Sequence, residues 1–337
     1  MKSLSPQIKN TINQKLSSYS SFPFPVEKIN SRQSWAANRL WMENQQMISK
    51  RNGKKSRYHW YCFSFMVNTF QRMLRLTDFY EKGVQNAKNI VLREIPIYLP
   101  NLPQAFQDFS ILHLSDLHLE GIPDLTNRIL SVIDNRRVDL CVLTGDYRSA
   151  LHGSIAPTLH SLKTLIDGIH SHHGFLGVLG NHDDCHMVNP MEEIGIRMLI
   201  NENCWIHKFN ERLQVIGTDD VSMYYTDQAL HALEKAHEDC TIALVHSPEL
   251  YDIAAQMGVD LYLCGHTHAG QICLPGGKAI VNGGLKNGSQ YYRGAWKYQH
   301  MQGFTSSGVG TSGIPIRFNT RGEVLILRLR QGSPTFY

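Results

Sequence analysis

The stretch VDLYLCGHTHAGQICLPGG, residues 259–277, passes within a few positions from an apolar run to two histidines among glycines. The run 259–264 predicts a buried strand. His266 and His268 stand two residues apart just beyond it, where side chains at i and i+2 share a side and can reach a common point. Taken alone, the pair fits a polar turn as well as a metal site. The other strand ends of the chain must decide between the two.

The same alternation of apolar run and polar turn recurs from residue 109 onward. Strands are predicted at 109–115, 138–144, 174–180, 204–209, 213–218 and 241–246, and helices at 124–136, 157–170, 189–202, 226–238 and 249–257. Alternating strands and helices indicate a layered α/β architecture. Unbroken apolar runs are typical of strands covered on both faces. The closing run GEVLILRLR, 322–330, alternates and predicts a strand with one solvated face.

Five of these strands are followed directly by residues that bind metal ions in proteins. The residues are Asp116, His118, Asp146, Asn181, His246, His266 and His268. In open α/β sheets, ligands bind beyond the carboxyl ends of the strands. Two carboxylates, one amide and four imidazoles exceed the roughly three protein ligands of a catalytic zinc, and they suit two ions that share a carboxylate. The mixed set favours Mn²⁺, Fe, Zn²⁺ or Co²⁺ over Ca²⁺ or Mg²⁺.

The order of the motifs resembles that of one known superfamily. The blocks are DLH at 116–118, GD at 145–146, GNHD at 180–183, a lone histidine at 246 and GHTH at 265–268. Over about residues 95–330 they are similar to the calcineurin-like metallophosphoesterases. The resemblance implies the metallo-dependent phosphatase fold, a four-layer α/β arrangement in which a two-sheet β-sandwich is flanked by helices.

The resemblance also implies roles for individual residues. One divalent ion would be held by Asp116, His118, Asp146 and His268, and a second by Asp146, Asn181, His246 and His266. The ions, Mn²⁺ above all, would polarise the phosphoryl group of a phosphoester or diphosphate. His182 would stabilise developing charge or protonate the leaving oxygen, with Asp183 orienting it. Arg148 is either a substrate-phosphate contact or an ordinary surface arginine.

Three stretches, 97–119, 265–277 and 308–318, resemble a membrane-associated bacterial branch of the superfamily. That branch contains phosphodiesterases and the UDP-2,3-diacylglucosamine pyrophosphatases of lipid A biosynthesis, which release UMP and lipid X. The resemblance therefore favours a lipid-linked substrate. Two alternatives remain open: a phosphodiesterase acting on soluble nucleotides, and a non-catalytic metal-binding scaffold. A scaffold usually loses ligands, whereas all seven and His182 are present here.

The N-terminal segment, residues 1–95, is set apart by composition from a metallophosphoesterase domain at 96–337. Residues 1–57 are polar, so irregular structure or short helices are expected there. Residues 60–76 predict an amphipathic helix that either packs on the domain or, with the basic residues from 50 onward, lies on an anionic membrane surface. The partners expected are a phosphorylated small molecule or lipid-linked substrate and this membrane surface. No nucleic-acid polymer and no obligate protein partner are implied.

The composition of the chain indicates a cellular compartment but does not indicate which reaction the protein catalyses. The 337 residues are 42% hydrophobic and carry a net charge of +4, which allows a sizeable core. Seven cysteines are scattered without a CxxC pair, which favours a reducing compartment. Neither an apolar signal-peptide region nor a run of about 18 apolar residues is found. A cytoplasmic protein, peripheral on the inner membrane, is therefore expected.

Overall fold

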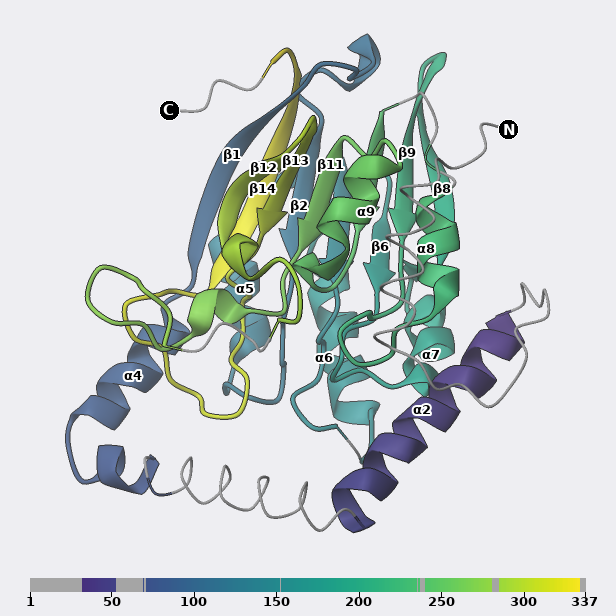
Figure 1. The fold of residues 1–337 in the computed structure, drawn as a ribbon. Helices are drawn as coiled ribbons and strands as arrows, with labels where there is room; N and C mark the ends of the chain where they lie inside the picture. Colours follow the sequence, from purple (N-terminus) through teal and green to yellow (C-terminus); the bar gives the residue numbers. More distant parts are fainter. Residues whose placement is uncertain are drawn as a thin grey trace.

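Two six-stranded β-sheets packed face to face form the centre of the molecule in a computed structural model (Figure 1). The model describes residues 32–52, 69, 71–151, 153–234, 236, 240–280 and 285–333. In order across it, the first sheet contains β1 (Val91–Leu99), β14 (Glu323–Gln331), β2 (Ser110–Leu114), β4 (Leu140–Thr144), β6 (Phe175–Val178) and β7 (Ile196–Met198). The second contains β12 (Gly294–Tyr298), β13 (Met301–Thr305), β11 (Leu261–Cys264), β10 (Thr241–Leu244), β9 (Glu211–Gly217) and β8 (Glu202–Lys208). A two-stranded ribbon pairs β3 (Arg137–Val138) with β5 (His170–Ser171).

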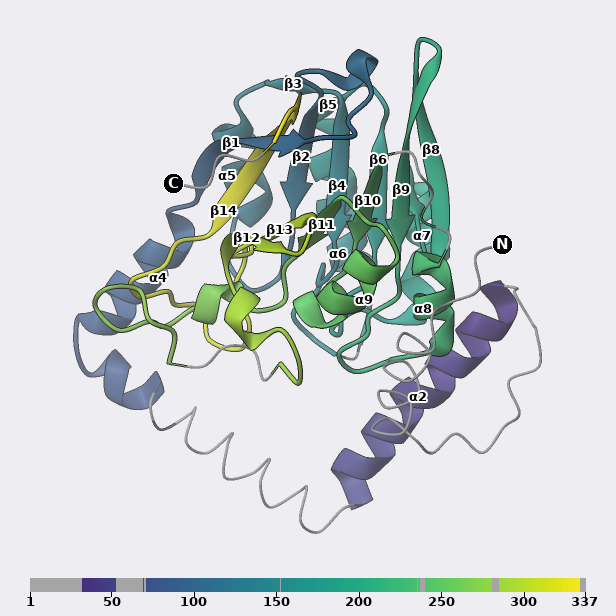
Figure 2. The same cartoon turned by 45° about the horizontal axis from the view of Figure 1, so that its top comes forward.

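Helices cover the outer faces of both sheets and complete four layers (Figure 2). The first sheet packs against α5 (Leu125–Ile133), α6 (Ala156–Asp167) and α7 (Val188–Glu193), and the second against α8 (Asp227–Leu233) and α9 (Tyr251–Gln256). A third apolar cluster fills the space between the sheets, with Val142 and Leu244 among its fully enclosed side chains. The predicted helix-flanked β-sandwich is therefore confirmed.

The central strands are buried on both faces, as their apolar runs predict. All five residues of β2 and of β4, and all four of β10 and of β11, are buried. In the first sheet β2, β4 and β6 run parallel, and in the second β9, β10 and β11 do. Parallel strands bring their carboxyl ends to one edge of a sheet. The metal-binding residue types therefore gather where these two edges meet.

The C-terminal strand differs from its prediction. The sequence favours one solvated face for 322–330, yet the first five residues of β14 are all buried. The reason is position: β14 lies between β1, which it pairs in parallel, and β2, which it pairs antiparallel. Strand β1 was not predicted, and the expected boundary between residues 95 and 96 falls inside it.

One predicted helix proves to be two elements. A helix was expected at 189–202. Helix α7 instead ends at Glu193, and the chain then forms the edge strand β7. Gly195 lies between the two elements with φ +108°, a conformation that a helix cannot continue through. Short 3₁₀ turns complete the fold: η1 (Gln104–Phe106), η2 (Cys185–Met187), η3 (Pro248–Leu250), η4 (His268–Gly270) and η5 (Ser289–Tyr291).

The N-terminal segment contains a long helix rather than irregular structure. Helix α2 (Arg32–Asn52) has 21 residues and lies beside α7 and α8 in both views (Figures 1 and 2). Trp35, Arg39 and Met42 are buried at i, i+4 and i+7, one face of a helix. The prediction of an irregular or short-helical 1–57 is therefore wrong for this part.

The segment that follows α2 is described in part. Most of the predicted amphipathic helix at 60–76 lies outside the described residues, and 71–75 are helical. Helix α4 (Phe79–Lys88) then leads into β1 and buries Gly83 and Ala87. In the described part of the chain, no helix combines the length and apolarity needed to cross a membrane.

Candidate metal centre

The first group of metal-binding side chains comes from three loops at the shared edge of the sheets. The group consists of Asp116, His118, Asp146 and His268, whose ligand atoms all lie within 4.8 Å of one another. His118 Nε2 lies 3.5 Å from Asp146 Oδ2, and His268 Nε2 lies 3.6 Å from Asp116 Oδ1. The two Nε2 atoms are 3.2 Å apart. All four side chains are buried.

The protonation of His118 suits a cation at this point. Its Nδ1 lies 2.9 Å from the carbonyl oxygen of Arg148, so this nitrogen carries the proton and donates it. Nε2 then presents a lone pair toward Asp146 and His268. Burial lowers the pKa of His118 to about 4, so the ring is neutral at neutral pH. Lone pairs that face one another in a buried space need a cation between them, so these residues fit a metal ion.

A second group lies on the other side of Asp146. Asn181 Oδ1 is 3.0 Å from His246 Nε2 and 2.8 Å from His266 Nδ1. His246 donates Nδ1–H to the carbonyl of Thr144 at 2.7 Å, so its Nε2 faces Asn181 and Asp146. That Nε2 lies 3.5 Å from Asp146 Oδ2. Burial opposes a charge here, but the Asp146 carboxylate outweighs it and raises the pKa of His246 well above its ordinary value, so an ion bound at this point would replace a proton.

Asp146 joins the two groups. Its Oδ2 lies 3.5 Å from Nε2 of His118 and 3.5 Å from Nε2 of His246, one histidine from each group. Its Oδ1 accepts a hydrogen bond from the backbone N–H of His182 at 2.8 Å. Burial opposes ionisation, but the surrounding histidines outweigh it and lower the pKa of Asp146 well below its usual range. The buried Asp and His cluster is thus suited to a pair of divalent metal ions.

The backbone at the ligand residues adopts an unusual conformation. Five of the seven candidate ligands have a positive φ: Asp116, His118, Asp146, His266 and His268. Residues in this left-handed region cost of order 1–3 kcal/mol each, and they persist where the surrounding structure holds them. Sharp turns of this kind aim side chains from strand ends back across the edge of the sheet.

Two glycines make the close approach of these turns possible. A Cβ added to Gly265 would lie 1.9 Å from Ser115 Oγ and 2.2 Å from Asp116 Oδ2. A Cβ at Gly180 would lie 2.2 Å from Asp146 Oδ1. Since real Cβ atoms do not come this close to other atoms, any larger residue would displace a candidate ligand.

His182 and Asp183 do not contact each other as the sequence predicts. The Asp183 carboxylate accepts hydrogen bonds from the backbone N–H groups of Asp146, Tyr147 and Gly180, at 2.8–2.9 Å. His182 Nδ1 instead lies 2.9 Å from the carbonyl oxygen of Ser149. The predicted orienting role of Asp183 is therefore corrected: Asp183 ties the GD turn to the GNHD turn, and Ser149 orients the His182 ring.

Arg148 is not the surface residue that one interpretation expected. Its side chain is 1% exposed, and Nη1 lies 3.6 Å from Asp184 Oδ2. Its Nη2 donates to the carbonyl of Gly153 at 3.4 Å, while Nε and Nη1 make no hydrogen bond among the described residues. The carbonyl of Arg148 holds His118 in place, as described above. Contact of its side chain with a substrate phosphate stays a prediction.

Two further buried arginines, which sequence reasoning missed, hold the loops of the site. Arg317 donates to the backbone carbonyls of His268, Ser307, Gly308, Gly310 and Arg321. Arg39, from α2, donates to the carbonyls of Gly180 and Asp183. A signal was present for each. Arg317 interrupts the apolar run IPIRF, and Arg39 stands at helical spacing between Trp35 and Met42.

Fold and site together define a metallophosphoesterase, with a buried Asp and His cluster at the carboxyl ends of two helix-flanked sheets. The sequence model of the Calcineurin-like phosphoesterase family matches residues 109–270, which include every candidate ligand. Residues 109–270 form a domain of the calcineurin-like metallophosphoesterase superfamily, and the protein is a metal-dependent hydrolase of phosphoester bonds.

Similar proteins come from several bacteria. The uncharacterized metallophosphoesterase YkoQ of Bacillus subtilis is 27% identical over 75% of this chain and 95% of its own length. The phosphodiesterase YaeI of Escherichia coli is 25% identical over 66% of this chain and 82% of its own. A solved structure, TT1561 of Thermus thermophilus, is 11% identical, with a TM-score of 0.40 over 60% of this chain and 91% of that chain.

Proposed function

We propose that the chain hydrolyses a phosphodiester or diphosphate bond with two divalent cations, Mn²⁺ by preference. One would be bound by Asp116, His118, Asp146 and His268, and the other by Asp146, Asn181, His246 and His266. The observation that carries the proposal is the position of Asp146 Oδ2, 3.5 Å from one histidine of each group. When bound, such a pair neutralises phosphoryl charge and activates a water molecule.

His182 is the residue that we propose acts on the leaving group. Its backbone N–H donates to Asp146 Oδ1, and its Nδ1 is hydrogen-bonded to the carbonyl of Ser149. The ring therefore has a fixed orientation, and Nε2 is the nitrogen left to donate a proton to a leaving oxygen. The ring lies edge-on to that of His118, with centroids 4.9 Å apart, so it borders the first ligand group.

The test is an assay on bis(4-nitrophenyl) phosphate with purified protein stripped of metal and then supplied with Mn²⁺. We expect activity to return with Mn²⁺ and kcat to fall by about 10²–10⁴-fold in His182→Ala. The loss in His182→Ala should be larger for an ester with a poorer leaving group, because such a group depends more on the proton. No hydrolysis at any metal concentration would reject the enzyme and favour a non-catalytic metal-binding scaffold.

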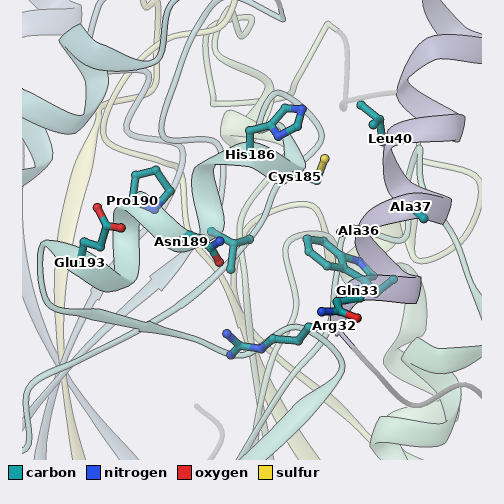
Figure 3. A pocket seen from close by; sticks show the side chains of 12 residues that line it. Arg32, Gln33, Ala36, Ala37, Leu40, Cys185, His186, Asn189, Pro190 and Glu193 are labelled. Carbon is teal, nitrogen blue, oxygen red and sulfur yellow. The ribbon is translucent and has the colours of Figure 1, made fainter.

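A cavity against helix α2 supports a lipid-linked diphosphate as a second candidate substrate. It has a volume of about 540 Å³ and lies between α2 and the segment formed by η2 and α7 (Figure 3). Apolar side chains line much of it, including Trp35, Leu40 and Val188. Cys185 and His186 of its wall come two and three residues after Asp183, the last residue of the GNHD turn. We propose that it takes an acyl chain of a substrate such as UDP-2,3-diacylglucosamine, in a cytoplasmic protein that works at the inner membrane.

A substitution at Leu40, which is 38% exposed on α2, should affect the turnover of the two substrate classes differently. We expect Leu40→Asp to reduce release of UMP from UDP-2,3-diacylglucosamine, because a charge would enter the apolar wall. Hydrolysis of bis(4-nitrophenyl) phosphate by the same variant should not change. If the lipid substrate is not hydrolysed by wild-type protein, or if Leu40→Asp leaves its turnover unchanged, the chain acts on other phosphodiesters, soluble nucleotides among them.

A further inference from the structure

Helix α2 lies outside the residues that match the family, yet it reaches the loops of the metal centre. The match begins at residue 109, and α2 ends at residue 52. In Figures 1 and 2 the helix lies along the edge at which the candidate ligands gather, next to α7 and α8. The contact is made by Trp35 and Arg39, which are 5% and 0% exposed.

Arg39 binds both ends of the turn that carries Asn181 and His182. Its Nη2 donates to the carbonyl of Gly180 at 3.2 Å and to that of Asp183 at 2.8 Å. These two residues flank Asn181, a candidate ligand of the second ion, and His182. The guanidinium therefore holds the turn in addition to the contacts that the Asp183 carboxylate makes with the GD turn.

The charge of Arg39 is compensated within the same contact. Nε donates to Glu43 at 2.8 Å, and Nη1 forms an ion pair with Asp219, the second residue after β9. Asp219 also accepts a hydrogen bond from Trp35 Nε1 at 2.6 Å. A buried cation is tolerated only when it is paired and hydrogen-bonded. The second sheet thus supplies the anion that allows α2 to bring an arginine to a turn of the first sheet.

Glu43 extends the contact of α2 to Cys185, two residues beyond the end of the turn. It stands one helical turn after Arg39 and accepts a hydrogen bond from the backbone N–H of Cys185 at 3.0 Å. Arg39 and Glu43 together therefore bind backbone groups at Gly180, Asp183 and Cys185. Asn181 and His182 lie between these anchored backbone groups. The turn is also held by the bond from the His182 N–H to Asp146 and by the contacts of Asn181 with His246 and His266.

We propose that α2 is a working part of the metal centre and that Arg39 is a positioning residue for Asn181 and His182. The proposal rests on the two-ion function above. According to the proposal, α2, which lies outside the family domain, completes the second ion site. The first ion site does not depend on α2, since its loops are held by Arg317 and by the GD turn.

The experiment is calorimetric titration of metal-stripped protein with Mn²⁺, together with kcat on bis(4-nitrophenyl) phosphate at saturating Mn²⁺. We expect Arg39→Ala to bind the first ion as wild type does and the second about 10–100-fold more weakly, as expected when a group supporting a ligand is lost. Its kcat should fall. Arg39→Lys keeps the charge but cannot reproduce the forked donation. Its affinity for the second ion and its kcat should therefore lie between those of wild type and of Arg39→Ala.

Arg32→Ala is the matched control. Arg32 is on the same helix and pairs with Glu192 and Glu202, but it does not contact the 180–183 turn. We expect it to keep both ion affinities. If Arg39→Ala proves unfolded by circular dichroism, Glu43→Gln gives the milder variant, with a smaller loss at the second ion. Equal weakening of both ions, or affinities and kcat within twofold of wild type, would overturn the proposal.

The same data separate this proposal from the function on which it rests. Wild-type protein that binds one ion would refute the two-ion scheme. The comparison of kcat then decides the role of α2. A fall in Arg39→Ala that Arg32→Ala does not share supports positioning of His182, and equal kcat values refute it.

Discussion

The two loops that complete the metal centre are each held by a buried arginine, but in different ways. Arg317 donates to five backbone carbonyls and so joins His268 of the GHTH loop to the segment between β13 and β14, and in the described part of the chain it hydrogen-bonds to no carboxylate. Arg39 holds the GNHD turn through two carbonyls and pairs with Glu43 and Asp219. Arg317 belongs to the fold that it stabilises, while Arg39 arrives on a separate helix with its charge partners. We therefore expect loss of the first to affect the whole domain and loss of the second to affect one turn.

The largest effect is expected at Asp146, the residue that the two ligand groups share. Asp146→Asn keeps the size of the side chain but removes the charge that both ligand groups face. We expect kcat to fall by on the order of 10³-fold or more, about 4 kcal/mol of barrier. Calorimetry should show both ions weakened. A variant that loses a single ion would show that Asp146 serves one group and that the two loops are independent.

Arg317→Ala tests the claim that this arginine stabilises the domain. Its removal leaves several buried carbonyls without donors, at about 1–3 kcal/mol for each unsatisfied group that water cannot reach. We expect the free energy of unfolding in urea to fall by about 3 kcal/mol or more. Arg39→Ala should cost less, because α2 can detach while the sheets remain folded. Equal losses in the two variants would remove the distinction between the two arginines.

A smaller and more local effect is expected from Gly265→Ala. The added methyl group would overlap Ser115 and Asp116 and push a candidate ligand of the first ion out of place. We expect about 10–100-fold weaker binding of the first ion by calorimetry, with the second ion less affected. Gly258→Ala is the control for backbone strain without a clash, because Gly258 has φ +92° and its Cβ would meet open space away from the ligands. If both variants bind metal equally well, the loop is more compliant than its packing indicates.

The pH dependence of stability tests β2, the strand that leads to Asp116. His113 in β2 is enclosed, and burial lowers its pKa to about 3. Its neutral form is therefore kept in the folded state, while the unfolded chain gains a proton below about pH 6.5. The contribution of His113 to the free energy of unfolding is therefore fully present above that pH, and it is lost as the pH falls toward 3.

Between pH 6.5 and pH 5 the loss from His113 should be about 2 kcal/mol. His113→Gln cannot titrate, so urea unfolding at the two pH values should show a correspondingly smaller difference in the variant. Parallel behaviour of variant and wild type would mean that acid sensitivity arises in the loops, not in the strand that supports them.

The gathering of candidate ligands could be predicted from the sequence because it follows from local patterns. Apolar runs long enough for buried strands each end in Asp, Asn or His, and parallel strands end at one edge. The partners of His182 and Asp183 could not be predicted in this way. Which backbone N–H group or carbonyl a side chain meets depends on how two turns from different strands are packed.

The missed elements have a common cause, which is contact over long sequence distances. Arg39 is polar in a polar segment, and its importance arises from Asp219, 180 residues away. The alternation in β14 predicted solvent on one face, but its neighbours β1 and β2 lie more than 200 residues earlier in the chain. Composition and periodicity depend only on residues that are close in the sequence, so they cannot predict pairings between residues that are far apart in it.

The place of β14 also sets the order in which the protein can assemble during synthesis. Strands β1 and β2 belong to one sheet but are joined through β14, so neither has its full set of partners until residue 331 has left the ribosome. Until then the nascent chain presents two open strand edges, which other chains can pair with. All seven candidate ligands lie between residues 116 and 268, so they are synthesised before β14 closes the sheet whose strand β2 leads to Asp116.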